Sequence, residues 1–207
     1  LSSPSSGVVA VDATSKLSAL HGGLAQVGLE LKASGRWGVS VASLPDLDGD
    51  SHGELCVAAG IGSYADILFL SSDGAGGSFV VRAGVRLSSD SSSVLPAAMR
   101  ARIVSGSRWG VGVAHLGDLD GDGVPELAVS AVADDAGATD AGAVFILSMT
   151  PMPAVDVRFK QDVVVELSIN TEGATGRLAA GTVAGGDNLG AWAESVGSID
   201  DVDGDGV

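Results

Sequence analysis

The sequence has a single cysteine, few aromatic residues and no long apolar run, and each shortage excludes a class of protein. Cys56 has no second cysteine to pair with, so no disulfide forms within the chain, and we expect this thiol to be buried on a strand. The best apolar candidate for a membrane span, Ala143 to Met149, is far shorter than the roughly 20 residues that such a helix needs. We therefore expect no membrane segment in these 207 residues.

Basic residues are also scarce. The chain has 11 Lys and Arg against 26 Asp and Glu, which gives a net charge of -15 at pH 7. Nucleic acids and anionic membranes are bound through basic patches, so we expect no nucleic-acid partner. The sequence also lacks a Gly-x-Ser-x-Gly nucleophile, a Cys/His pair at motif spacing and a phosphate-binding loop. These absences predict a protein that is not an enzyme.

Glycine, by contrast, is abundant, with 31 residues, while aromatic residues make up 4% of the chain. Many short strands joined by many turns produce this composition, whereas long helices do not. Hydrophobic residues make up 45%, which is enough for a core and argues against a disordered acidic tail. The composition therefore favours an all-β protein.

Three stretches share one acidic pattern, and we name them loops 1, 2 and 3. Loop 1 (46–54) reads DLDGDSHGE, loop 2 (118–126) reads DLDGDGVPE, and loop 3 (201–207) reads DVDGDGV. Carboxylates stand at positions 1, 3 and 5 of each loop and at position 9 of loops 1 and 2. These eleven acids are a large part of the 26 in the chain, so much of the negative charge has a local explanation.

The spacing of the acids predicts a loop folded around a hard cation, because alternate side chains can point inward with a backbone carbonyl at position 7. Oxygen ligands without thiolates favour Ca²⁺ over zinc or copper, with one ion per loop and an incomplete third site. The predicted ligands are Asp46, Asp48, Asp50, His52 (backbone O) and Glu54; Asp118, Asp120, Asp122, Val124 (backbone O) and Glu126; and Asp201, Asp203, Asp205 and Val207 (backbone O).

An EF-hand shares the first half of this pattern but needs a glutamate at position 12. That position is Val57 after loop 1 and Val129 after loop 2, and a β-rich run follows instead of a helix. The loops are therefore not EF-hands. The aspartates could also be read as glycosidase acids, but their 1-3-5-9 spacing within one turn suits metal ligation better.

The rest of the sequence repeats in step with the loops. A tryptophan stands nine residues before each loop (Trp37, Trp109 and Trp192), and a Leu-Ser pair lies further upstream each time. After the loops, ELCVAA matches ELAVSA, and the run 66–71 is matched to the run 143–148. Repeats of roughly 70 to 80 residues indicate a protein built from similar units.

Each repeat is predicted to contain four short strands, which is one blade of a β-propeller. Blades bury their faces against neighbours, so about two and a half repeats form an incomplete ring of four-stranded antiparallel blades. The predicted strands are 37–44, 55–59, 67–70, 79–81, 109–116, 127–131, 144–147 and 163–167.

We interpret the whole chain, 1–207, as one propeller fragment. Residues 1–16 are the tail of a preceding blade, 17–86 are repeat 1, 87–166 are repeat 2, and 167–207 are the truncated start of repeat 3. The chain begins on Leu1 and ends inside loop 3, so we expect a fragment at both ends.

The segments RWGVSVA…DLDGD…ELCVAA and RWGVGVAHLGDLDGDGVPELAVSA…GAVFIL resemble FG-GAP repeats, the blades of the integrin α-subunit propeller and of many extracellular repeat proteins. Trp37-Gly38 and Trp109-Gly110 stand where that family has Phe-Gly. The resemblance covers nearly the whole chain. It implies that each loop joins two adjacent strands of a blade, with calcium on one rim of the propeller.

This resemblance implies a calcium-binding, non-catalytic module for adhesion or protein–protein interaction, with an unknown protein or glycan ligand. An extracellular or cell-surface setting is expected, because millimolar calcium outside cells fills even weak sites. Two alternatives remain: a propeller appended to a secreted enzyme, and a carbohydrate-binding propeller that uses the tryptophans as a platform. We expect the tryptophans to pack between blades instead.

The three loops depart unequally from the pattern. Ser51 replaces glycine at position 6 of loop 1, which costs about 1 kcal/mol if the backbone there is left-handed. Pro45 stands where loop 2 has Gly117, and Ala193 replaces the glycine after the third tryptophan. Loop 2 is therefore predicted to bind calcium most tightly, loop 1 less tightly and loop 3 most weakly.

Overall fold

The computed structural model describes residues 13–74, 78–135, 139–150, 157–168 and 176–177. Loop 3, Trp192 and residues 1–12 of the tail expected at 1–16 lie outside the described residues, so the predictions made for them stay predictions. Within the described residues, nearly all regular structure is β, as the sequence predicts.

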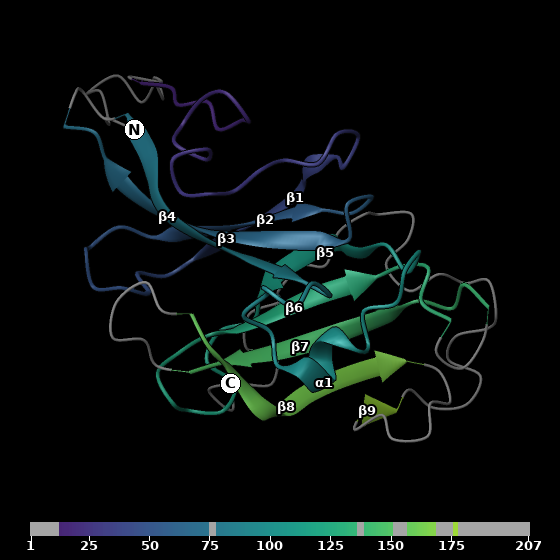
Figure 1. Cartoon of the computed structure of the whole chain (residues 1–207). Helices are drawn as coiled ribbons and strands as arrows, with labels where there is room; N and C mark the ends of the chain where they lie inside the picture. Colours follow the sequence, from purple (N-terminus) through teal and green to yellow (C-terminus); the bar gives the residue numbers. More distant parts are fainter. Residues whose placement is uncertain (1–12, 75–77, 136–138, 151–156, 169–175, 178–207) are drawn as a thin grey trace, which may run out of the picture.

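Two antiparallel sheets make up the fold, and in each the strands pair in chain order. The first blade consists of β1 (Trp37–Leu44), β2 (Glu54–Ala59), β3 (Tyr64–Ser72) and β4 (Phe79–Ser88). The second blade consists of β5 (Trp109–His115), β6 (Glu126–Ala131), β7 (Ala143–Met149) and β8 (Phe159–Ser168), with a two-residue strand, β9 (Gly176–Arg177), parallel to β8. Figure 1 shows the first blade in blue stacked on the second in teal and green. The sheets are not closed into a ring, which is the arrangement of an incomplete β-propeller.

The main core lies between the two blades. Apolar side chains of β2 and β3 pack there against those of β5, β6 and β7 in one continuous cluster. Trp109 belongs to this cluster and is fully buried, so the prediction that a tryptophan packs between blades is confirmed for this residue. Trp37 is half-buried on the far face of the first blade, against the cluster of Leu24, Leu29, Val57, Leu68 and Val81.

Both blades begin with the same irregularity. The register between the first two strands shifts between Trp37 and Val41 and again between Trp109 and Val113, and each interval contains the glycine that follows the tryptophan. Gly38 has φ 89° and Gly110 has φ 87°, a conformation that favours glycine. At Gly110 a side chain would also clash, because an added Cβ would lie 2.7 Å from the Tyr64 carbonyl oxygen of the first blade.

The third strands pair differently from the sequence match of 66–71 with 143–148. Leu55 pairs with Leu68, and its counterpart Leu127 pairs with Leu147, so the true match is shifted by two residues. A two-residue shift keeps every side chain on the same face of the sheet, so the apolar pattern could not reveal it. The fourth strands are also longer than predicted, and the Leu-Ser pairs end them.

A short helix, α1 (Ala97–Arg100), was not predicted. It begins after Pro96 in the connection between the blades, and it carries Met99 into the core together with Leu95 and Ile103. The four-residue spacing of these three apolar residues was the signal that the strand-based interpretation missed.

Gly110→Ala is expected to destabilise the protein more than Gly38→Ala. Both substitutions place a side chain at positive φ, which costs about 1 kcal/mol. Gly38 has open space around it, whereas Gly110 meets the Tyr64 backbone, so the added methyl must push the blades apart. Urea unfolding of both variants measures the difference, and equal losses would contradict the close contact between blades.

Candidate metal sites

Loops 1 and 2 lie at the same end of their blades and connect equivalent strands. Loop 1 joins β1 to β2, and loop 2 joins β5 to β6. The strand pairing brings Leu44 opposite Glu54, so the first and last residues of loop 1 stand close together. In loop 2 the amide of Leu116 donates to the carbonyl of Glu126, and the amide of Glu126 donates to the carbonyl of Gly117 at 2.7 Å.

The aspartate at position 1 organises each loop by accepting hydrogen bonds from backbone amides. Asp46 Oδ1 accepts from Gly49 at 2.7 Å and from Asp50 at 3.1 Å, and its Oδ2 accepts from Ser51 at 2.8 Å. Asp118 makes the same three contacts in loop 2, at 2.8, 3.1 and 2.7 Å. These bonds lower the pKa of Asp46, with the Ser51 amide as the largest cause. The loops are therefore folded by their own backbone, and the other carboxylates are free to converge.

The glutamate at position 9 closes each loop and leaves one oxygen without a partner. Glu54 and Glu126 are each 1% exposed. One oxygen of each accepts from the amide at position 2, at 2.8 Å from Leu47 and 2.6 Å from Leu119. The other oxygen, Oε1, is buried with no hydrogen-bond partner in either residue. A buried carboxylate oxygen without a partner is costly, so both loops present an acceptor that fits a cation.

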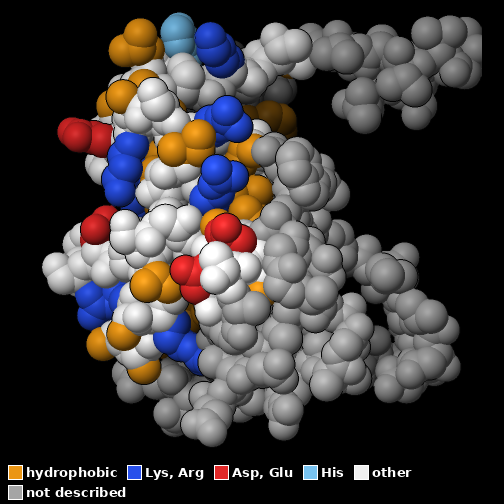
Figure 2. Space-filling model, turned by 90° about the vertical axis from the view of Figure 1, so that its right-hand side faces the viewer, with side chains coloured by type: hydrophobic (Ala, Val, Ile, Leu, Met, Phe, Trp, Pro, Cys, Tyr) orange, Lys and Arg blue, Asp and Glu red, His pale blue; other side chains and the backbone are white. Residues whose placement is uncertain are grey.

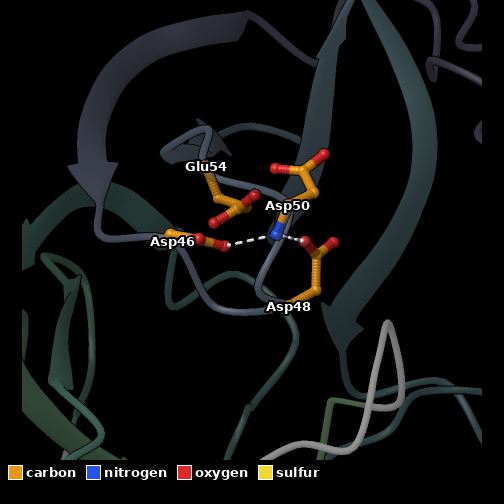
Figure 3. A group of neighbouring side chains, drawn as sticks. All are labelled: Asp46, Asp48, Asp50 and Glu54. Carbon is orange, nitrogen blue, oxygen red and sulfur yellow. Dashed lines mark hydrogen bonds between the residues drawn. The ribbon is translucent and has the colours of Figure 1, made fainter.

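Four carboxylates lie close together in loop 1, and three in loop 2. Figure 3 shows Asp46, Asp48, Asp50 and Glu54 of loop 1 gathered around the turn. One ligand atom from each lies within 4.8 Å of the others, and the same holds for Asp118, Asp120 and Glu126 in loop 2. Oxygens on opposite sides of a Ca²⁺ ion are about 5 Å apart, so the spacing suits such an ion.

Electrostatics at position 9 reflect the crowding of acids. Burial is the largest of the causes that together raise the pKa of Glu54 to about 7; the carboxylates of Asp48, Asp46 and Asp50 add to it, and the Leu47 amide acts in the opposite direction. Burial likewise raises the pKa of Glu126. Each glutamate therefore sits in a place where its negative charge is disfavoured unless a cation is near.

A basic side chain from the fourth strand reaches into each loop, which the sequence analysis missed. Arg82 of β4 contacts Asp48 through Nη2 and lies 3.2 Å from Asp50 through Nε. Lys160 of β8 contacts Asp120 and lies 2.9 Å from Asp122. The Lys160 ammonium is the main cause that lowers the pKa of Asp122. In both loops the base therefore bridges positions 3 and 5.

The sequence predicts a backbone carbonyl ligand at position 7, from His52 and Val124. The amides of both residues donate to the aspartate at position 5, at 2.8 Å. The His52 ring lies 3.2 Å from Asp50 and packs edge-on against Phe79, outside the group of converging carboxylates. The carbonyl role of both residues stays a prediction, as does the ligand set of loop 3.

The backbone at position 6 is left-handed, with φ 69° at Ser51 and 87° at Gly123, so the condition attached to the cost of Ser51 is met. Ser51→Gly is therefore expected to stabilise the metal-free protein by about 1 kcal/mol, and the reverse change, Gly123→Ser, to destabilise it by a similar amount. Chemical denaturation in the presence of a chelator measures both. A loss of stability in Ser51→Gly would show that the Ser51 side chain matters more than its backbone.

No helix in the described part of the chain is long and apolar enough to cross a membrane. A family model described as FG-GAP repeat matches residues 109–147. The match begins at the first residue of β5, runs through loop 2 and ends in β7. No curated protein matches the chain.

Proposed function

From the FG-GAP repeat that the chain carries and from its incomplete propeller fold, we propose that the protein is an extracellular, calcium-binding β-propeller module for adhesion or protein–protein interaction. The observation that carries the calcium part is the buried Oε1 of Glu54 and of Glu126, each without a partner at the centre of an acidic loop. The ions are structural in this proposal, and the module has no catalytic role.

Calcium suits the loops better than other common cations. All side-chain donors are carboxylate oxygens, which disfavours zinc and copper. Calcium accepts six to eight oxygens in a flexible arrangement, whereas magnesium demands a tighter octahedron and gives up its water reluctantly. The carboxylates together with the position-7 carbonyl and water supply enough oxygens for calcium.

Bound calcium would hold the hairpin of each blade. An ion that binds the folded loop and not the unfolded chain stabilises the fold, by about 2.7 kcal/mol at a hundredfold excess over the dissociation constant. Affinities of extracellular modules lie in the range of about 10⁻⁴ to 10⁻³ M, which millimolar calcium satisfies. This match supports an extracellular setting.

The rim opposite the metal loops supplies a surface for a partner. The pairing of Trp37 with Ala59 lies at the other end of β1 from the pairing of Leu44 with Glu54. A hollow of about 490 Å³ opens at that end, between the β2–β3 turn and the connection that carries α1. Its lining includes Lys32, Arg108 and one acid, Asp90.

Two features of this hollow favour an acidic partner with aliphatic side chains. Ile61 and Val104 are each 54% exposed at its edge. Among the described residues, neither Arg36 nor Arg108 makes an ion pair, and both line a second, smaller hollow beside it. Figure 2 shows a face on which Lys and Arg side chains lie among apolar ones, in a protein that is acidic as a whole.

Fewer observations support the two alternatives, a carbohydrate-binding propeller and a propeller attached to a secreted enzyme. Trp109 is fully buried between the blades, so it cannot serve as a sugar platform on the surface. A propeller attached to a secreted enzyme is compatible with the same calcium loops and the same rim, and the chain on either side of these residues distinguishes it from a free-standing module.

Calcium is expected to raise the melting temperature of the protein by several degrees over the value in chelator, because each loop gains a ligand in the folded state alone. Calorimetric titration of Asp118→Ala is expected to lose the tighter site, and that of Asp46→Ala the weaker one. Equal melting temperatures with calcium and with chelator would refute structural calcium, and loss of the tighter site in Asp46→Ala would reverse the order of the loops.

Peptides selected from a displayed library on the calcium-loaded protein are expected to combine Asp or Glu with aliphatic residues. Their binding should fall at least tenfold in Arg108→Glu, because the reversal removes one attraction and adds a repulsion at the hollow. Lys16→Glu makes the same charge change at an exposed residue that does not line either hollow, and serves as the control. Selection of basic peptides would contradict this surface.

A further inference from the structure

We propose that Arg82 and Lys160 are built-in counter-cations that hold the metal loops in the absence of calcium and must leave the aspartates at positions 3 and 5 for calcium to bind. This inference rests on the proposed calcium function and adds a determinant of affinity to it. The base that each blade carries would set how much calcium is needed to fill its loop.

The two bases occupy equivalent places in the blades. Arg82 follows Val81, which pairs with Leu70, and Lys160 follows Phe159, which pairs with Met149. Both come from the fourth strand, far along the chain from the loop that they enter. The same arrangement in two blades with different residues, Arg in one and Lys in the other, indicates a requirement for positive charge rather than for one side-chain shape.

Each base contacts the same two of the four carboxylates. Arg82 bridges Asp48 and Asp50, and Lys160 bridges Asp120 and Asp122. Within the described part of the chain, no base forms an ion pair with the carboxylates at positions 1 and 9 of either loop; these carboxylates accept from backbone amides, and Oε1 of the glutamate has no hydrogen-bond partner. An ion that takes oxygens from positions 1, 3, 5 and 9 therefore competes with the base at positions 3 and 5, and at those positions alone.

The charges explain why the base is present. Four carboxylates in loop 1 and three in loop 2 lie within a few ångströms of one another and repel, and one cation offsets part of that repulsion in the metal-free loop. A divalent ion offsets twice as much and also meets the buried glutamate oxygen, which no base contacts. Calcium therefore replaces the base because it satisfies an acceptor that the base leaves without a partner.

The two blades differ in how tightly the base closes the loop. The Asp48 side chain under Arg82 is 1% exposed, whereas the Asp120 side chain under Lys160 is 34% exposed. The planar guanidinium covers its carboxylate, while the ammonium acts as a compact, strongly hydrated charge. Loop 1 should thus resist calcium more than loop 2, in the same direction as the cost of Ser51.

The test measures calcium affinity and metal-free stability in the same variants. Lys160→Met keeps most of the side chain and removes the charge, and Lys160→Arg keeps the charge. Both are made in an Asp46→Ala/Asp201→Ala background, so that loop 2 alone titrates. Lys32→Met, which removes the same charge at the opposite rim, is the control. Calorimetry with CaCl₂ gives the affinity, and thermal unfolding in chelator gives the stability.

Lys160→Met is expected to bind calcium roughly three- to tenfold more tightly than the parent, because two exposed ion pairs no longer compete. Its metal-free melting temperature is expected to fall, and the gain in affinity to shrink with added KCl, since salt screens the lysine's competition. Lys160→Arg and Lys32→Met should leave the affinity within about twofold.

Two outcomes would overturn the inference while leaving the calcium function intact: normal binding by the parent with unchanged affinity in Lys160→Met, or weaker binding in that variant, which would make the lysine a support of the loaded loop. Absence of calcium binding in the parent and in every variant would overturn the calcium function together with the inference. Binding by Lys160→Met alone would support the exchange in its strongest form.

Discussion

The close approach of the two sheets at Gly110 is the contact on which the rest of the structure depends. Gly110 lies against the Tyr64 backbone, and Gly60 lies against Val111, where an added Cβ would come within 2.5 Å of the valine side chain. These contacts let the face of one blade settle on the next and enclose Trp109. This packing also sets the distance from loop 1 to loop 2 and the arrangement of the opposite rim, because the loops and the rim lie at the two ends of the packed strands.

Each loop is held by two kinds of contact, hydrogen bonds from backbone amides to carboxylates and ion pairs between carboxylates and a base. The aspartate at position 1 uses its oxygens to fold the turn, and the glutamate at position 9 ties the end of the turn back to its beginning. Charge that remains at positions 3 and 5 is met by a base from the far strand. A loop that protein groups hold in shape in this way would have a low ordering cost for the binding of the proposed ion.

The sequence predicted the all-β class, the blades and the place of the loops, because period, turn residues and acid spacing are local signals. It missed what depends on pairing over long distances. Lys160 contacts Asp120 of loop 2 across 40 residues of chain, and no local sequence pattern around either residue indicates this contact. The two-residue shift of the third strands escaped because it preserves the alternation of faces. The helix α1 was missed because it is one turn long.

The third strands, β3 and β7, also differ in one buried residue, and this difference distinguishes the first blade from the second. Asp66 is fully buried, bonded to Arg86 at 2.8 and 2.9 Å and to the Trp37 indole at 3.0 Å. The equivalent residue in the second blade is Phe145, which pairs with Val129 as Asp66 pairs with Val57. Arg86 further packs on the Tyr64 ring, 3.9 Å from its centre.

Similar repeats in one chain risk exchanging strands during folding, since each strand finds nearly equivalent partners in the neighbouring unit. A third strand of the first blade inserted into the second would bury the Asp66 carboxylate without Arg86, at a cost of about 3 to 5 kcal/mol. The ion pair itself adds little to the free energy of unfolding of the correct fold. Its consequence is specificity, because it destabilises a propeller in which strands of the two blades are exchanged and so favours the correct pairing within each blade.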